Sequence, residues 1–132
     1  MAKLVEYKDM NPRAKAVVDG IATARGIDPA NINNVWKALA RHPGVMEQFA
    51  AEMKAAFAPG KLDPLTKELV YIAVSITNSC RYCVHSHTAA ARAKGMTEDM
   101  YADLLRVVST AGRTNQLLNA LQVPVDKAFD FE

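Results

Sequence analysis

Residues 68–87 read ELVYIAVSITNSCRYCVHSH, and this stretch holds both cysteines of the chain, Cys80 and Cys83. After its opening glutamate the first half is uncharged, and its apolar residues do not alternate with polar ones. Such a run is typical of a helix that is buried on several faces. Asn78 and Ser79 are common helix-capping residues, so a second helix is expected to begin at or next to Cys80. The stretch therefore predicts two consecutive helices that meet at the cysteines.

Proline and glycine divide the rest of the chain into segments of helical length, with almost no period-two alternation. Asn11-Pro12 and Asp63-Pro64 each place a capping residue before a proline, which is a common start of a helix. The expected helices run from residue 12 to about 26, over 32–40, from 45 to about 58, over 65–77, from 80 to about 95, and over 100–108 and 117–121. We therefore predict an all-α fold of about six or seven helices in a single domain, residues 1–132.

The composition fits a globular chain, because half of the 132 residues are hydrophobic and can form a core. The formal net charge is +2, and no basic run interleaved with aromatic residues is present, so no nucleic-acid partner is expected. The longest apolar segment is well short of the roughly 20 residues that span a bilayer, and the N-terminus does not resemble a secretory signal. We predict a cytoplasmic protein without a membrane partner.

A C-x-x-C pair serves either reversible disulfide chemistry or metal ligation. On a regular helix Cys80 and Cys83 lie about 60° apart, and His87 falls between them. Along the helix axis His87 lies about 6 Å from Cys83 but about 10 Å from Cys80, so its imidazole is better placed to act on Cys83. His85 lies about 160° from His87, which makes it a surface residue and makes a four-ligand zinc site difficult to form here.

Two assignments of the reactive thiol are open from these residues. Cys80 lies beside a helix N-terminus, where the helix dipole favours a thiolate. Cys83 has His87 as a general base, and Glu68 is a candidate to orient the imidazole. We favour Cys83, because only that thiol has a side-chain proton acceptor. The alternative for Glu68 is an exposed acidic residue in the first turn of its helix.

Glu68, Cys80, Cys83 and His87 form the pattern E-x11-C-x2-C-x3-H. This pattern resembles the signature of alkylhydroperoxidase D (AhpD)-like proteins in the carboxymuconolactone decarboxylase superfamily. The likeness continues on both sides of the pattern, so that the motif core covers about residues 35–115. The full spacing is much more specific than a C-x-x-C pair alone.

The resemblance implies an all-helical protein that assembles into trimers or hexamers and acts as a thiol-dependent peroxidase. It implies that Cys83 is the peroxidatic cysteine, that Cys80 is the resolving cysteine, and that Glu68 and His87 belong to a proton relay. The expected partners are a hydroperoxide substrate, a dithiol or lipoyl-type protein reductant, and further copies of the chain. No cofactor and no metal ion are expected.

Tyr82 departs from the best-known members of the family, which have a histidine of the proton relay between the cysteines. A phenol is a poor base near neutral pH, although it can donate a hydrogen bond or pass a proton through water. We therefore predict an antioxidant peroxidase of the alkylhydroperoxidase type with Tyr82 as a further site residue. The alternatives are a general disulfide oxidoreductase with weak peroxidase activity, and a metal-binding or structural helical oligomer. Decarboxylase activity is not expected, because that branch of the superfamily lacks the cysteine pair.

Overall fold

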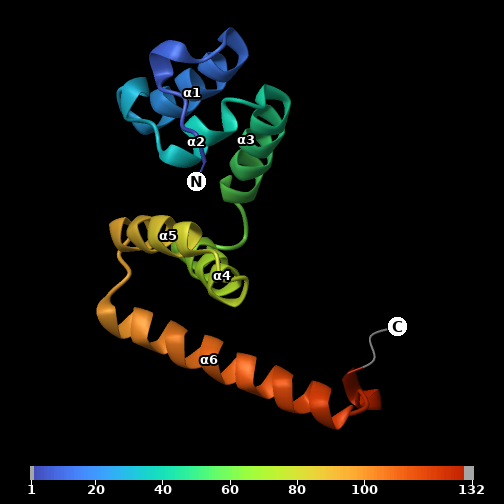
Figure 1. The fold of residues 1–132 in the computed structure, drawn as a ribbon. Coiled ribbons are helices and arrows are strands. Elements are labelled where there is room, and N and C mark those ends of the chain that lie inside the picture. Colours follow the sequence, from blue (N-terminus) through green and yellow to red (C-terminus); the bar gives the residue numbers. More distant parts are fainter. Residues whose placement is uncertain (1, 130–132) are drawn as a thin grey trace. The chain divides into compact units, whose positions relative to one another are not determined.

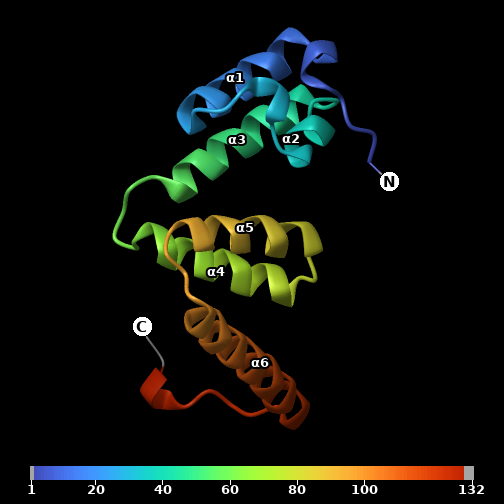
Figure 2. The ribbon, with the colours of Figure 1, turned by 90° about the vertical axis from the view of Figure 1, so that its left-hand side faces the viewer.

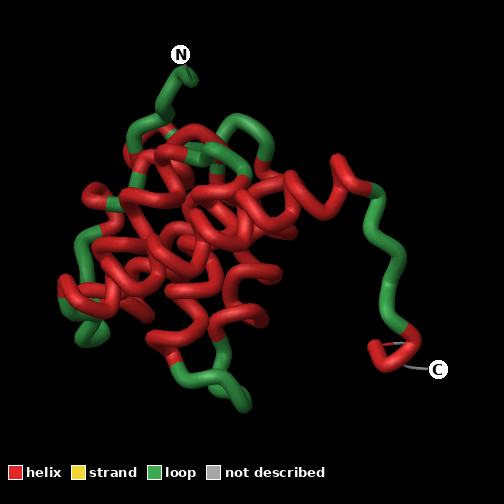
Figure 3. The backbone as a smooth tube through the Cα atoms, turned by 90° about the horizontal axis from the view of Figure 1, so that it is seen from below, coloured by secondary structure: helices red, strands yellow, loops and turns green. Residues whose placement is uncertain are grey.

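The computed structural model describes residues 2–129, and this part of the chain consists of helices and loops without a strand (Figure 3). The helices are α1 (Pro12–Arg25), α2 (Asn34–Leu39), α3 (Pro43–Phe57), α4 (Pro64–Thr77), α5 (Arg81–Ala93) and α6 (Glu98–Leu121), with short 3-10 turns at Tyr7–Asp9, Pro29–Asn31 and Lys127–Phe129. The predicted all-α class is confirmed. Within residues 2–129 we find no helix long and apolar enough to cross a membrane.

The chain divides between Ala58 and Pro59 into two compact units, each of which is described by itself. The prediction of a single domain over residues 1–132 stays a prediction. The first unit contains α1, α2 and α3 (Figure 1). Its core is formed by buried apolar residues from all three helices and from the segments that flank them: Met10, Ala14, Val18, Ile32, Trp36, Ala40 and Met46.

Asn11 starts α1 and also links it to the end of α2. Its Oδ1 accepts a hydrogen bond from the Ala14 N–H (3.0 Å), which is the N-cap predicted from the Asn-Pro pair. Its Nδ2 donates to the carbonyl oxygen of Ala40 (3.2 Å). The helix ends at Gly26, whose φ of 64° is a left-handed conformation that glycine adopts without strain.

The second unit contains α4, α5 and α6, and α4 and α5 lie side by side in both ribbon views (Figures 1 and 2). Its core contains Ile72, Ala91 and Met96, with partly buried residues such as Leu104 packed against them. Asp63 caps α4 as predicted, since its Oδ1 accepts from the Thr66 N–H (3.0 Å). The hydrogen bonds that Thr66 donates lower the pKa of the Asp63 carboxyl, and the bond from the Thr66 hydroxyl has the largest effect.

The two segments predicted at 100–108 and 117–121 are one continuous helix, α6, so that part of the prediction was wrong. Gly112 lies between the two predicted segments, and glycine weakens a helix. A glycine inside a helix costs only about 1 kcal/mol relative to alanine, and no proline follows within the helix. The neighbouring turns therefore continue through it.

Three local predictions around α3 and α4 need correction. Helix α3 starts at Pro43 rather than at residue 45, because proline is well suited to the first helical position. Asn78 and Ser79 do not cap the cysteine helix; Asn78 is the C-cap of α4, and Ser79 has a φ of 57° in the turn that follows. The expectation that α4 is buried on several faces was wrong for Val70 and Val74, which are half exposed in the chain as described.

We expect Asn11→Ala to lower the free energy of unfolding by about 1–2 kcal/mol, because it removes the N-cap and the hydrogen bond to Ala40. Chemical denaturation followed by circular dichroism measures this loss. Asn11→Asp is the matched control, since it keeps an acceptor for the Ala14 N–H and removes only the amide donor. A loss as large for aspartate as for alanine would show that the cap contributes nothing.

Candidate active site

The two cysteines lie at the start of α5, where Cys80 is the N-cap and Cys83 is in the first turn. They form a disulfide, and their Cα atoms are 5.4 Å apart. The Cys83 N–H points to Cys80 Sγ at 3.4 Å, so a sulfur atom takes the position that a serine or aspartate oxygen usually has at a helix N-cap. The Cys80 N–H donates to the Ser75 carbonyl oxygen of α4 (2.9 Å), which fixes the turn between the helices.

Glu68 lies inside α4 and is only 3% exposed. One carboxylate oxygen, Oε2, is 2.7 Å from Nδ1 of His87, and the other, Oε1, accepts from Nζ of Lys94 at 2.7 Å. Both partners come from the neighbouring helix α5 and its C-cap. A buried carboxylate is unfavourable without such partners. The alternative of an exposed first-turn glutamate was therefore wrong.

The imidazole of His87 is held on its face as well as at its edge. The ring of Tyr71, three residues after Glu68 on α4, stacks on it with the ring centroids 3.7 Å apart and an angle of 24° between the planes. Stacking restricts rotation of the imidazole, while the hydrogen bond to Glu68 fixes which nitrogen faces the carboxylate. When Nδ1 carries the proton toward Glu68, Nε2 is the basic nitrogen of the neutral ring.

His87 follows Cys83 by four residues inside α5, which places both on the same side of the helix, as the helical spacing predicts. Helical spacing does not apply strictly to Cys80, because this residue is the N-cap of α5 and its ψ of 86° is not helical. The fold thus brings Glu68 and His87 together and pairs the two cysteines at the start of the same helix. Their assigned catalytic roles stay predictions.

Tyr82 is also on the first turn of α5, and 44% of it is exposed. Its role in the site stays a prediction. His85 is exposed, as predicted. In residues 2–129 no group of three or more His, Cys, Asp or Glu side chains is arranged to hold a metal ion.

Lys94 and Tyr71 were not predicted from the sequence as residues of the site. Lys94 follows His87 by seven residues, which is two helical turns and nearly the same face, and Tyr71 follows Glu68 by three. These spacings were available as signals. Lysine is common on exposed helix faces, however, and only the pairing of α4 with α5 shows that this one contacts a buried carboxylate.

The chain is similar in sequence to one protein family and to several known proteins. The sequence profile described as the carboxymuconolactone decarboxylase family matches residues 43–126. An uncharacterised protein of the cox locus of Paracoccus denitrificans is 33% identical over 63 residues, which are 48% of this chain and 57% of that protein. The alkyl hydroperoxide reductase AhpD of Solibacter usitatus is 28% identical over 118 residues, covering 89% of this chain and 66% of that protein. The chain thus spans little more than half the length of the first of these relatives.

A solved structure agrees with these sequence matches over nearly the whole chain. The crystal structure of the alkylhydroperoxidase AhpD core from Rhodospirillum rubrum has a TM-score of 0.86 and 48% sequence identity, and the match covers 92% of this chain and 88% of that one. The predicted AhpD-like fold is confirmed by this likeness. The chain therefore belongs to the carboxymuconolactone decarboxylase family, and within it to the AhpD-like proteins.

Proposed function

We propose that the protein is a thiol-dependent peroxidase of the alkylhydroperoxidase type, with Cys83 as the peroxidatic and Cys80 as the resolving cysteine. The observation that carries the proposal is the pairing of Cys80 with Cys83 at the start of α5, one turn before His87, which is hydrogen-bonded to the buried Glu68. This combination provides a nucleophile, a second thiol, a base and a group that orients the base.

In the first step, His87 accepts the proton of Cys83, and the thiolate attacks the terminal oxygen of a hydroperoxide ROOH. The O–O bond breaks as the S–O bond forms, so that Cys83 becomes a sulfenic acid and the peroxide is reduced by two electrons. The departing alkoxide takes a proton from the His87 imidazolium and leaves as the alcohol ROH. Throughout the step the Glu68 carboxylate keeps Nδ1 protonated and the ring in place.

In the second step, the thiol of Cys80 attacks the sulfenic acid of Cys83, which releases water and forms the disulfide. A dithiol or lipoyl-type protein then returns two electrons and two protons and restores both thiols. Cys80, as the cap at the very start of α5, is the sulfur that we assign to the attack by this reductant. A cytoplasmic setting, in which thiols are kept reduced at rest, fits such a cycle.

The second candidate function is a general disulfide oxidoreductase with weak peroxidase activity, and Tyr82 favours it. Attack on a disulfide releases a thiolate, which is a much weaker base than an alkoxide and needs no proton donor to leave. A site with a phenol in place of a relay histidine can therefore retain disulfide exchange while peroxide reduction becomes slower.

We expect the fully reduced protein to lose about 2 Da within minutes when one equivalent of cumene hydroperoxide is added, as measured by intact mass spectrometry under denaturing conditions. Cys83→Ser is expected to show no oxidation at its remaining thiol in that time. Cys80→Ser is expected to gain about 16 Da, because the sulfenic acid cannot be resolved.

Rapid peroxide consumption by Cys83→Ser would disprove the assignment of the two cysteines. Oxidation of the wild type by a small disulfide but not by the hydroperoxide would favour the second candidate function.

We expect Tyr82→His to increase the rate of peroxide consumption about tenfold or more, because it adds a base to the first turn of α5. Tyr82→Phe removes only the hydroxyl and should lower the rate if that group passes a proton. The rate of exchange with a small disulfide is the matched control for both variants and should change much less. Equal rates for Phe, Tyr and His at this position would exclude residue 82 from the proton path.

We further propose that the chain forms homo-oligomers through the distal part of α6. From Ser109 to Leu121 every residue of this helix is exposed, and the one charged residue in that segment is Arg113. Apolar and small residues recur along the helix with the 4-3 spacing of a coiled-coil seam: Met100, Leu104, Val107, Ala111, Thr114, Leu118 and Leu121. We name this stripe the α6 seam.

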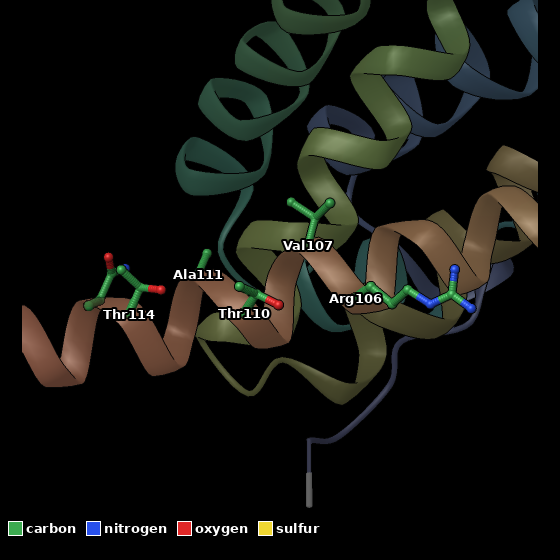
Figure 4. Close-up of a pocket in the computed structure, with 6 residues that line it drawn as sticks. Arg106, Val107, Thr110, Ala111 and Thr114 are labelled. Carbon is green, nitrogen blue, oxygen red and sulfur yellow. The ribbon is translucent and has the colours of Figure 1, made fainter.

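The proximal end of the α6 seam is used inside the second unit, since Leu104 packs against the Ile72 core, whereas the distal end is exposed, with Val107 67% and Leu121 72% accessible. Figure 4 shows Val107 and Ala111 on the same side of α6. Both residues line an open hollow of about 490 Å³ on this helix. Arg113 lies off the seam, so a second copy of the seam meets no like charge. A seam of this kind is self-complementary, which favours another copy of the chain as its partner.

We expect the wild type to sediment as an oligomer at micromolar concentration and Leu118→Glu to sediment as a smaller species, because the variant places a charge in the seam. Analytical ultracentrifugation measures both. Gln116→Glu introduces the same charge on the opposite face of α6 and should leave the assembly intact. A monomeric wild type, or equal sedimentation of Leu118→Glu and the wild type, would contradict this interface.

A further inference from the structure

Lys94 is a group near the site that the proposed mechanism does not use. It is the C-cap residue of α5, and its side chain, 37% exposed, reaches from the surface to the buried carboxylate of Glu68. The 2.7 Å contact to Oε1 leaves Oε2 for His87. One carboxylate therefore has two nitrogen partners, one of which carries a fixed positive charge near neutral pH.

We propose that Lys94 is a positioning residue that keeps the His87 imidazole neutral and therefore able to accept a proton. A buried carboxylate requires a counter-charge. Lys94 supplies this charge, so Glu68 can accept the Nδ1–H of a neutral imidazole. Without Lys94 the nearest group that can become positive is His87 itself, whose protonated form would then be favoured, so that a smaller share of the imidazole could act as a base.

The groups that face this carboxylate come from two helices. From α5 and its C-cap these are His87 and Lys94, and from α4 the phenol of Tyr71 lies against the imidazole. Two charged residues from the neighbouring part of the second unit are already paired with each other, since Arg92 Nη2 donates to Glu98 Oε1 at 2.7 Å. Lys94 is thus the group whose charge most directly opposes that of Glu68.

The charge of the imidazole does not depend on peroxide chemistry, and only the consequence for Cys83 rests on the proposed function. The charge of the His87 imidazole can be tested separately from the peroxidase function, because in the disulfide form no thiol titrates near His87. The chain has three histidines, so the imidazole signals are few enough to assign by substitution. The experiment is therefore a pH titration of the His87 ring protons by NMR on the oxidised protein.

We expect Lys94→Met to move the titration midpoint of the His87 imidazole upward by about one pH unit or more, because it removes a like charge near the imidazolium and leaves the carboxylate of Glu68 without its other cation. Lys94→Gln keeps a polar side chain without the charge and should give the same direction. Lys94→Arg keeps the charge and should restore the wild-type titration. Lys127→Met removes an exposed lysine of the 3-10 turn Lys127–Phe129, which is in the same unit as His87, and should have no effect.

An unchanged or lowered midpoint in both Lys94→Met and Lys94→Gln would overturn the inference. It would mean that Glu68 loses its charge instead, or that another cation replaces Lys94. If Lys94→Met does not fold, the comparison of the glutamine and arginine variants still decides the question, since they differ in charge. A raised midpoint in a protein that consumes no hydroperoxide would support the role of Lys94 while contradicting the proposed peroxidase function.

Discussion

The arrangement of the second unit depends on one buried carboxylate. Glu68 is buried on α4, and its two oxygens bind one side chain near the middle of α5 and one at its end. An apolar residue at this position would bury surface at no electrostatic cost, whereas a buried carboxylate needs a compensating charge and hydrogen-bond donors. The ion pair therefore restricts how α5 can slide or rotate on α4, because a shift of one residue would separate His87 from Glu68.

The same pair of helices sets the geometry of the cysteines. Ser75 interrupts the apolar run of α4, and its carbonyl oxygen accepts the Cys80 N–H, so the chain turns sharply before α5 begins. Ser79 takes the left-handed conformation of this turn. Cys80 is left as the cap, with its sulfur accepting from the Cys83 N–H in the first turn of the helix, where the helix dipole favours a thiolate. Both His87 and the two cysteines are thus positioned by contacts between α4 and α5.

The sequence predicted the parts of the site that have a fixed local spacing. Cys83 and His87 share a helix face because they are four residues apart, and the start of α5 was predictable to within one residue. Lys94 and Tyr71 were missed because their importance depends on which helix packs against which, and spacing along one helix does not contain that information. The continuity of α6 was missed for a different reason, since a glycine lowers helix stability by an amount that the flanking turns can offset.

The chemistry of the site is limited by the number of groups that can move a proton. The proposed peroxide reduction needs a base that takes the proton of Cys83 and an acid that returns one to a strongly basic alkoxide, while disulfide exchange needs only the base. With a tyrosine at residue 82, His87 is the imidazole of α5 on the face that carries Cys83, whereas His85 is exposed on another face, and in the proposed mechanism His87 does both. A single group can serve as base and then as acid only if it starts each cycle neutral. In the proposed mechanism, the charge balance around Glu68 therefore affects more than the stability of the α4–α5 pair, because it determines whether one imidazole can complete both proton transfers.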